Sequence, residues 1–139
     1  MALSGAYKRN GFIAGFFDGF QGATLDSMPA PLKAAFLKVT PDKNRLQGMF
    51  EKDVARMVTF KDIADADIRS IKAPALIMVS DRDVVTVEHA LEMSHLISGA
   101  HLVVLPGLHG TCIGEICTVQ KGSKLPEMTV TLVEEFLNE

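Results

Sequence analysis

The feature that most constrains the fold is the apolar run Ala75-Leu76-Ile77-Met78-Val79, which lies between Pro74 and a pair of acids. A short, continuous apolar run bounded by turn residues is typical of a β-strand buried on both faces. Thr86 then begins a helix that ends near Gly99, and His101-Leu102-Val103-Val104-Leu105 has the pattern of a second strand. Strand, helix and strand within about 30 residues predict a parallel βαβ unit of the α/β class with a right-handed crossover.

The remainder of the chain has the pattern of helices separated by proline and glycine. Pro29 and Pro31 open a helix that runs to Val39, and Thr40-Pro41 predicts the N-cap of another helix that ends near Val58. Shorter helical pieces are expected over residues 62–70 and after Pro126, while residues 8–21 fit a weak helix or an irregular segment equally well. We therefore expect a helical region, residues 1–70, and a βαβα region, residues 71–139.

Composition bounds the functions that this chain can perform. The 139 residues are 47% hydrophobic and carry a net charge of −3 without a basic tract, which argues against nucleic acid as a partner. The apolar stretch after Lys8-Arg9 is too short for a signal peptide, and no run is long enough to span a membrane. Cys112 and Cys117 do not make a disulfide framework, so we expect a reduced, cytoplasmic setting.

Candidate functional residues follow the two predicted strands. The stretch Val79-Ser80-Asp81-Arg82-Asp83 ends the first strand, and Pro106-Gly107-Leu108-His109-Gly110 ends the second. Functional groups of open parallel sheets collect beyond the carboxyl ends of the strands, and neighbouring parallel strands end at the same edge. Asp83 and His109 are therefore expected to lie close together. A carboxylate that orients a histidine forms the acid–base part of a nucleophilic triad.

From Ile71 to the C-terminus these residues resemble the final third of an α/β-hydrolase. The matching stretches are Ile71 to Val79, then Ser80-Asp81-Arg82-Asp83, then Leu105-Pro106-Gly107-Leu108-His109-Gly110. The resemblance implies that Asp83 is the acid of the triad and His109 its base, and that Asp81 is a turn residue. Ser80 stands where the family usually has glycine, which concerns the geometry of the turn.

The helices before Ile71 resemble the lid of that family, and residues 24–29 and 57–60 fit it best. The family's G-x-S-x-G nucleophile motif and its oxyanion loop are not found in this chain. Ser4-Gly5 is the nearest fragment, and we expect no strand before it. The chain thus resembles a partial α/β-hydrolase fold with an N-terminal helical lid-like region. It is either a truncated form of a longer protein or a naturally short one.

Other interpretations of single residues stay open. A metal site would use Asp81, Asp83, His109 and Cys112, but it lacks a second ligand pair, so no metal or cofactor is expected. The Cys112 thiol could replace the missing nucleophile, although a small buried cysteine is commoner. Methionines at positions 49 and 57 could line an acyl pocket or pack in the core. His89 and His95 are interpreted as surface residues of a helix.

Two functional hypotheses follow. In the first, the chain is part of a hydrolase for an ester or related small-molecule acyl substrate. Asp83 orients His109, which acts as general base and then general acid, and the chain is inactive without a nucleophile half. In the second, it is a non-catalytic, hydrolase-derived domain that folds by homodimerisation, because two parallel strands leave edges unpaired. A third possibility is a module that binds a small molecule in the lid cavity.

Overall fold

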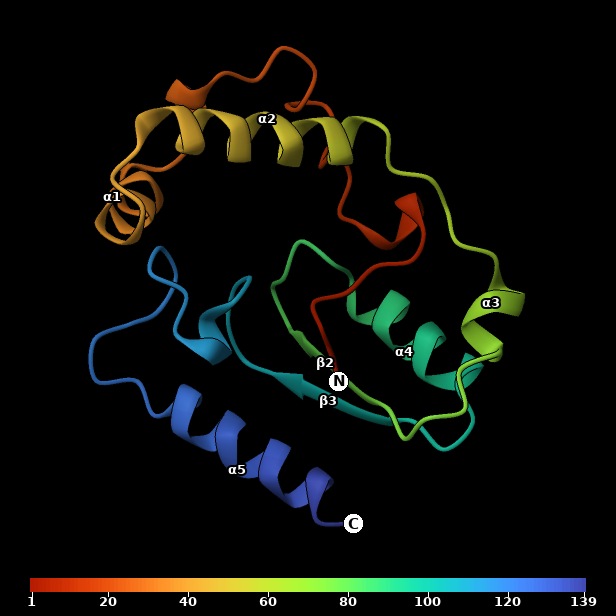
Figure 1. The fold of residues 1–139 in the computed structure, drawn as a ribbon. Helices are drawn as coiled ribbons and strands as arrows, with labels where there is room; N and C mark the ends of the chain where they lie inside the picture. Colours follow the sequence, from red (N-terminus) through yellow and green to blue (C-terminus); the bar gives the residue numbers. More distant parts are fainter. The chain divides into compact units, whose positions relative to one another are not determined.

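A computed structural model describes residues 1–139, which divide into two compact units. Residues 1–13 and 61–139 form a sheet unit, and residues 14–60 form a helical unit. The helical unit contains fewer residues than the predicted helical region of residues 1–70, because residues 1–13 and 61–70 belong to the sheet unit. Figure 1 shows the residues of both units.

The sheet has three parallel strands in the order β1-β2-β3, of which β2 and β3 are labelled in Figure 1. They are β1 (Ala2–Leu3), β2 (Leu76–Ser80) and β3 (His101–Leu105), and α4 (Val87–Leu96) connects β2 to β3. The predicted parallel βαβ unit is therefore confirmed. The expectation that no strand precedes Ser4-Gly5 is wrong, because β1 pairs with β2 directly before this dipeptide. A strand of two residues is too short to produce a recognisable hydrophobic pattern.

The residues of β2 alternate between two apolar layers, which explains why the whole strand is buried. Ile77 and Val79 pack in a cluster with residues of α4. Leu76 and Met78 pack in a second cluster with Leu105 and with residues of α5 (Leu125–Leu137). Helices thus cover both faces of the sheet, as the continuous apolar run predicts (Figure 1).

The segment before residue 14 is held against α4 by a buried histidine. His89 is only 3% exposed, so its interpretation as a surface residue is wrong. Its ring stacks on that of Tyr7 at 4.5 Å between centroids, and its Nε2 accepts a hydrogen bond from the Tyr7 backbone N–H at 3.2 Å. Burial lowers the pKa of His89, which keeps the imidazole in the neutral form that can accept this bond.

Two further contacts fix the same segment. Gly11, in the short 3₁₀ turn η1 (Arg9–Gly11), lies so close to His89 that an added Cβ would stand 2.4 Å from the imidazole ring. Lys8 reaches across with its Nζ 2.6 Å from a carboxylate oxygen of Asp65 and 3.3 Å from one of Glu92. Lys8 thereby joins α3 (Asp65–Arg69) to α4. The start of the chain is consequently an integral part of the sheet unit.

The helical unit contains η2 (Leu25–Ser27), α1 (Ala30–Val39) and α2 (Lys43–Val58). The helix predicted to end at Val39 is confirmed, whereas residues 14–22 form turns and no helix. Thr40 is the C-cap of α1 and does not cap α2. Asp42 is the N-cap instead, because its carboxylate accepts a hydrogen bond from the Asn44 N–H at 2.9 Å. None of the helices combines the length and the apolar character needed to cross a membrane.

Candidate active site

The carboxyl ends of β2 and β3 bring Asp83 and His109 together. Oδ1 of Asp83 lies 2.8 Å from Nδ1 of His109. The two residues are 26 positions apart in the sequence, and the register of the parallel strands, Ser80 beside Leu105, places their loops at the same edge. The pair therefore has the hydrogen bond that the acid and the base of a triad require.

Asp83 is a buried carboxylate with a full set of donors. Its side chain has no exposed surface. Oδ1 accepts hydrogen bonds from the backbone N–H groups of Val84 and Val85, at 2.7 and 3.3 Å, and Oδ2 accepts one from Oγ of Ser4 at 2.5 Å. Burial opposes the charge, but the hydrogen bonds from His109 and Ser4 outweigh it and lower the pKa of Asp83 to about 2. The carboxylate is thus ionised at neutral pH.

His109 is the exposed partner of this pair, with 54% of its side chain accessible. The hydrogen bond to Asp83 raises the pKa of His109 above its ordinary value, partial burial opposes this rise, and the negative charge of Glu115 adds to it. Because an ionised carboxylate only accepts, Nδ1 is the protonated ring nitrogen in the neutral imidazole. Nε2 is then the atom that can accept a proton from an attacking group.

The loop that carries His109 is shaped by its neighbours. Gly110 has a φ of 70°, and a Cβ there would stand 2.7 Å from the side chain of Glu115. Oγ1 of Thr118 donates a hydrogen bond to the carbonyl of His109 at 3.0 Å. A 3₁₀ turn, η3 (Thr111–Ile113), follows His109 in the same loop. These contacts hold residues 110–118 close to the backbone of His109.

Asp81, the other acid of the first loop, ties the two loops together. Its Oδ1 accepts a hydrogen bond from the Gly107 N–H at 2.7 Å, and its own N–H donates to the carbonyl of Leu105 at 2.8 Å. Asp81 is therefore the turn residue that the sequence indicates. Its hydrogen bonds go to the backbone of Gly107 and Leu105 and not to His109. The two neighbouring acids therefore have different tasks, since one shapes the loops and the other binds the imidazole.

Ser4 is a site residue that the sequence did not identify. Its hydroxyl donates to the acid, so it is not placed as a nucleophile beside the imidazole. The only local signal was the apolar stretch before Ser4-Gly5, which is too short for a recognisable strand pattern. The partner of Ser4 lies 79 residues away, and local sequence patterns do not report such a contact.

The alternatives based on Cys112 find no geometric support. Cys112 has no exposed surface and packs with Leu76, Met78 and Leu105 in the core beneath the sheet. A thiol that attacks a substrate must be accessible and ionised. The structure holds no group of three or more His, Cys, Asp or Glu side chains arranged to bind a metal.

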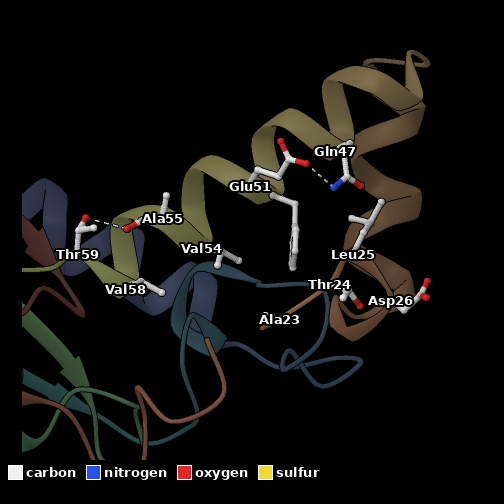
Figure 2. A pocket seen from close by; sticks show the side chains of 11 residues that line it. Ala23, Thr24, Leu25, Asp26, Gln47, Glu51, Val54, Ala55, Val58 and Thr59 are labelled. Carbon is white, nitrogen blue, oxygen red and sulfur yellow. Dashed lines mark hydrogen bonds between the residues drawn. The ribbon is translucent and has the colours of Figure 1, made fainter. Parts of the chain in front are cut away.

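The helical unit contains an open cavity of about 720 Å³ (Figure 2). It lies between residues 23–26 and one side of α2, which contributes the apolar side chains of Phe50, Val54 and Val58. Gln47 and Glu51 also line it, and the Gln47 amide donates to the Glu51 carboxylate at 2.8 Å. Met57 is not among the lining residues, while Met49 lines a separate cavity of about 430 Å³ together with Phe36 and Arg45.

Comparison with solved structures identifies the fold. The chain matches a meta-cleavage product hydrolase from Pseudomonas fluorescens IP01 over 98% of its length, with 17% identity and a TM-score of 0.58. An enol-lactonase from Burkholderia xenovorans LB400 (99% of this chain, 17% identity, TM-score 0.58) and a hydrolase from Pseudomonas aeruginosa PA01 (99%, 17%, 0.55) match similarly. This chain covers 54%, 55% and 54% of those proteins, respectively.

No protein-family model and no curated protein matches the sequence. The likeness to the solved structures is therefore one of fold, and it extends along nearly the whole chain while spanning little more than half of each hydrolase. Two features of the structure agree with this likeness of fold. They are the parallel sheet with helices on both faces and the position of the two loops at the carboxyl ends of its strands. The chain has a partial α/β-hydrolase fold.

Proposed function

We propose that this chain is the acid- and histidine-bearing part of an α/β-hydrolase-type enzyme that acts on an ester or a related acyl substrate. The observation that carries the proposal is the hydrogen bond of 2.8 Å between His109 and the buried carboxylate of Asp83. All three hydrolases compared above share the fold. One of them is named a lactonase, and a lactone is a cyclic ester.

In the proposed mechanism His109 moves a proton twice. Nε2 removes the proton from a serine hydroxyl while its oxygen attacks the carbonyl carbon of the substrate, and the imidazolium then gives that proton to the leaving oxygen. Asp83 holds the ring by Nδ1 and stabilises the imidazolium charge. A water molecule releases the acyl group by the same two proton transfers.

The serine and the oxyanion donors are supplied by a polypeptide segment other than residues 1–139. The only serine bonded to this pair, Ser4, uses its hydroxyl on the acid. Since the nucleophile and the oxyanion hole provide most of the rate enhancement of such enzymes, residues 1–139 by themselves are expected to be inactive. The acyl substrate is the proposed partner of the completed site.

The pairing itself is tested by titrating His109. Replacing Asp83 with asparagine exchanges the negatively charged acceptor that raises the pKa of His109 for a neutral amide, so this pKa is expected to fall. Nuclear magnetic resonance of the ring protons measures it in both proteins, with the remaining histidines as internal references. An unchanged pKa of His109 would contradict the proposal. In the unchanged chain, the basic form of the imidazole develops as the pH rises through the raised pKa.

The second candidate is a non-catalytic domain that associates with a copy of itself. The sequence-based argument expected two strands with unpaired edges, but β1 pairs with one edge of β2. The outer edge of β1 is now the one that another strand could pair with. Light scattering tests this candidate, since a homogeneous monomer would exclude it.

A further inference from the structure

The two carboxylate oxygens of Asp83 accept different numbers of hydrogen bonds. Oδ1 is bonded to His109 and to two backbone N–H groups, whereas the donor to Oδ2 is the hydroxyl of Ser4, at 2.5 Å. The side chain has no exposed surface, so solvent does not supply a replacement at its present position. A buried carboxylate oxygen without a donor is unfavourable, and the group would rotate or take up a proton.

The position of Ser4 is fixed independently of the loop that contains the acid. Its backbone N–H donates to the carbonyl of Met78 at 2.9 Å, which continues the pairing of β1 with β2. Its φ is 49°, and it is the sole residue other than glycine with a positive φ. Such a conformation is uncommon for serine, and an outlier held by its surroundings points to a role for the side chain.

We propose that Ser4 is a positioning residue for the acid: by occupying Oδ2 it keeps Oδ1 directed at Nδ1 of His109. This inference rests on the proposed function, because it assigns Ser4 a role within the same acid–histidine pair. The residue that follows β1, far from the two loops in the sequence, thereby contributes directly to the site. The role is one of orientation, since the hydroxyl contacts the carboxylate and not the imidazole.

The test is a titration of the Asp83 carboxyl carbon by nuclear magnetic resonance in the full chain. Ser4→Ala is expected to raise the pKa of Asp83 from about 2 towards the ordinary range of an aspartate, because the hydrogen bond from the hydroxyl is lost. Ser80→Ala is the matched control, because Ser80 is a buried serine of β2 whose hydroxyl has no hydrogen-bond partner.

Ser4→Gly provides a second variant if Ser4→Ala does not fold, because glycine adopts the positive φ without strain. An Asp83 pKa that stays near 2 in the variants without the hydroxyl would overturn the inference, as would an equal shift in Ser80→Ala. The result is separable from the proposed function. If the pKa of His109 does not respond to Asp83→Asn, the acid–histidine pair fails, whereas an unresponsive Asp83 in Ser4→Ala removes only the role of Ser4.

Discussion

Asp83→Asn is expected to lower kcat by about 10⁴-fold in a hybrid enzyme that unites residues 1–139 with a nucleophile-bearing part. In this hybrid, residues 1–139 replace the structurally equivalent part of the enol-lactonase from Burkholderia xenovorans LB400. Asparagine keeps the shape of the side chain but has no charge, so the imidazolium loses its stabilisation. Its amide can also present a donor to Nδ1 of His109 and thereby favour the wrong tautomer. Ester hydrolysis under saturating substrate measures the loss.

Asp81→Asn is the matched control for this prediction. Both substitutions remove one carboxylate charge from the same loop, but the amide oxygen of asparagine can still accept the hydrogen bond from Gly107. We therefore expect Asp81→Asn to keep most of the activity of the hybrid. Equal losses for the two variants would show that the effect comes from the net charge of the loop and would contradict the assignment of Asp83.

Gly11→Ala is expected to destabilise the chain by about 3 kcal/mol, the upper part of the usual range for overpacking a buried site. A Cβ on Gly11 would stand 2.4 Å from ring atoms of His89. The His89 ring is held in place, because it stacks on the Tyr7 ring and accepts a hydrogen bond from the backbone N–H of Tyr7. The free energy of unfolding, measured by urea denaturation, reports the cost.

Gly5→Ala is the control in the same segment. A Cβ at Gly5 has its nearest neighbour at 3.6 Å, an ordinary van der Waals distance. Its effect on the free energy of unfolding is expected to be within about 0.5 kcal/mol. If the two alanine variants unfold at the same urea concentration, the close packing of Gly11 on His89 does not contribute to stability as described.

The elements that the sequence predicted are those with strong local patterns. A continuous apolar run that begins after Pro74 is typical of a buried strand. A second apolar run, separated from the first by one helix, predicts that the two strands are parallel. The rule for the ends of parallel strands then brought Asp83 and His109 into one neighbourhood. Their hydrogen bond in the structure depends in addition on the strand register, which places Ser80 beside Leu105.

The features that escaped prediction depend on distant partners. β1 has two residues, and only its pairing with β2 makes it a strand. His89 is polar on the buried side of a helix, a position made favourable by a backbone N–H that lies 82 residues away. Ser4 depends on an acid that lies 79 residues away. The prediction that Thr40 is the N-cap of α2 failed for a local reason, because the carboxylate of Asp42 accepts the capping hydrogen bond instead.

The most direct measurement of the central claim is ester hydrolysis by three proteins: the chain of residues 1–139, the folded hybrid, and the hybrid with His109→Ala. The account predicts no significant turnover of nitrophenyl acetate by the chain alone, turnover by the hybrid, and loss of that turnover by at least about 10³-fold when His109 is replaced. A His109-dependent rate in the chain alone, or a hybrid whose activity survives His109→Ala, would contradict it.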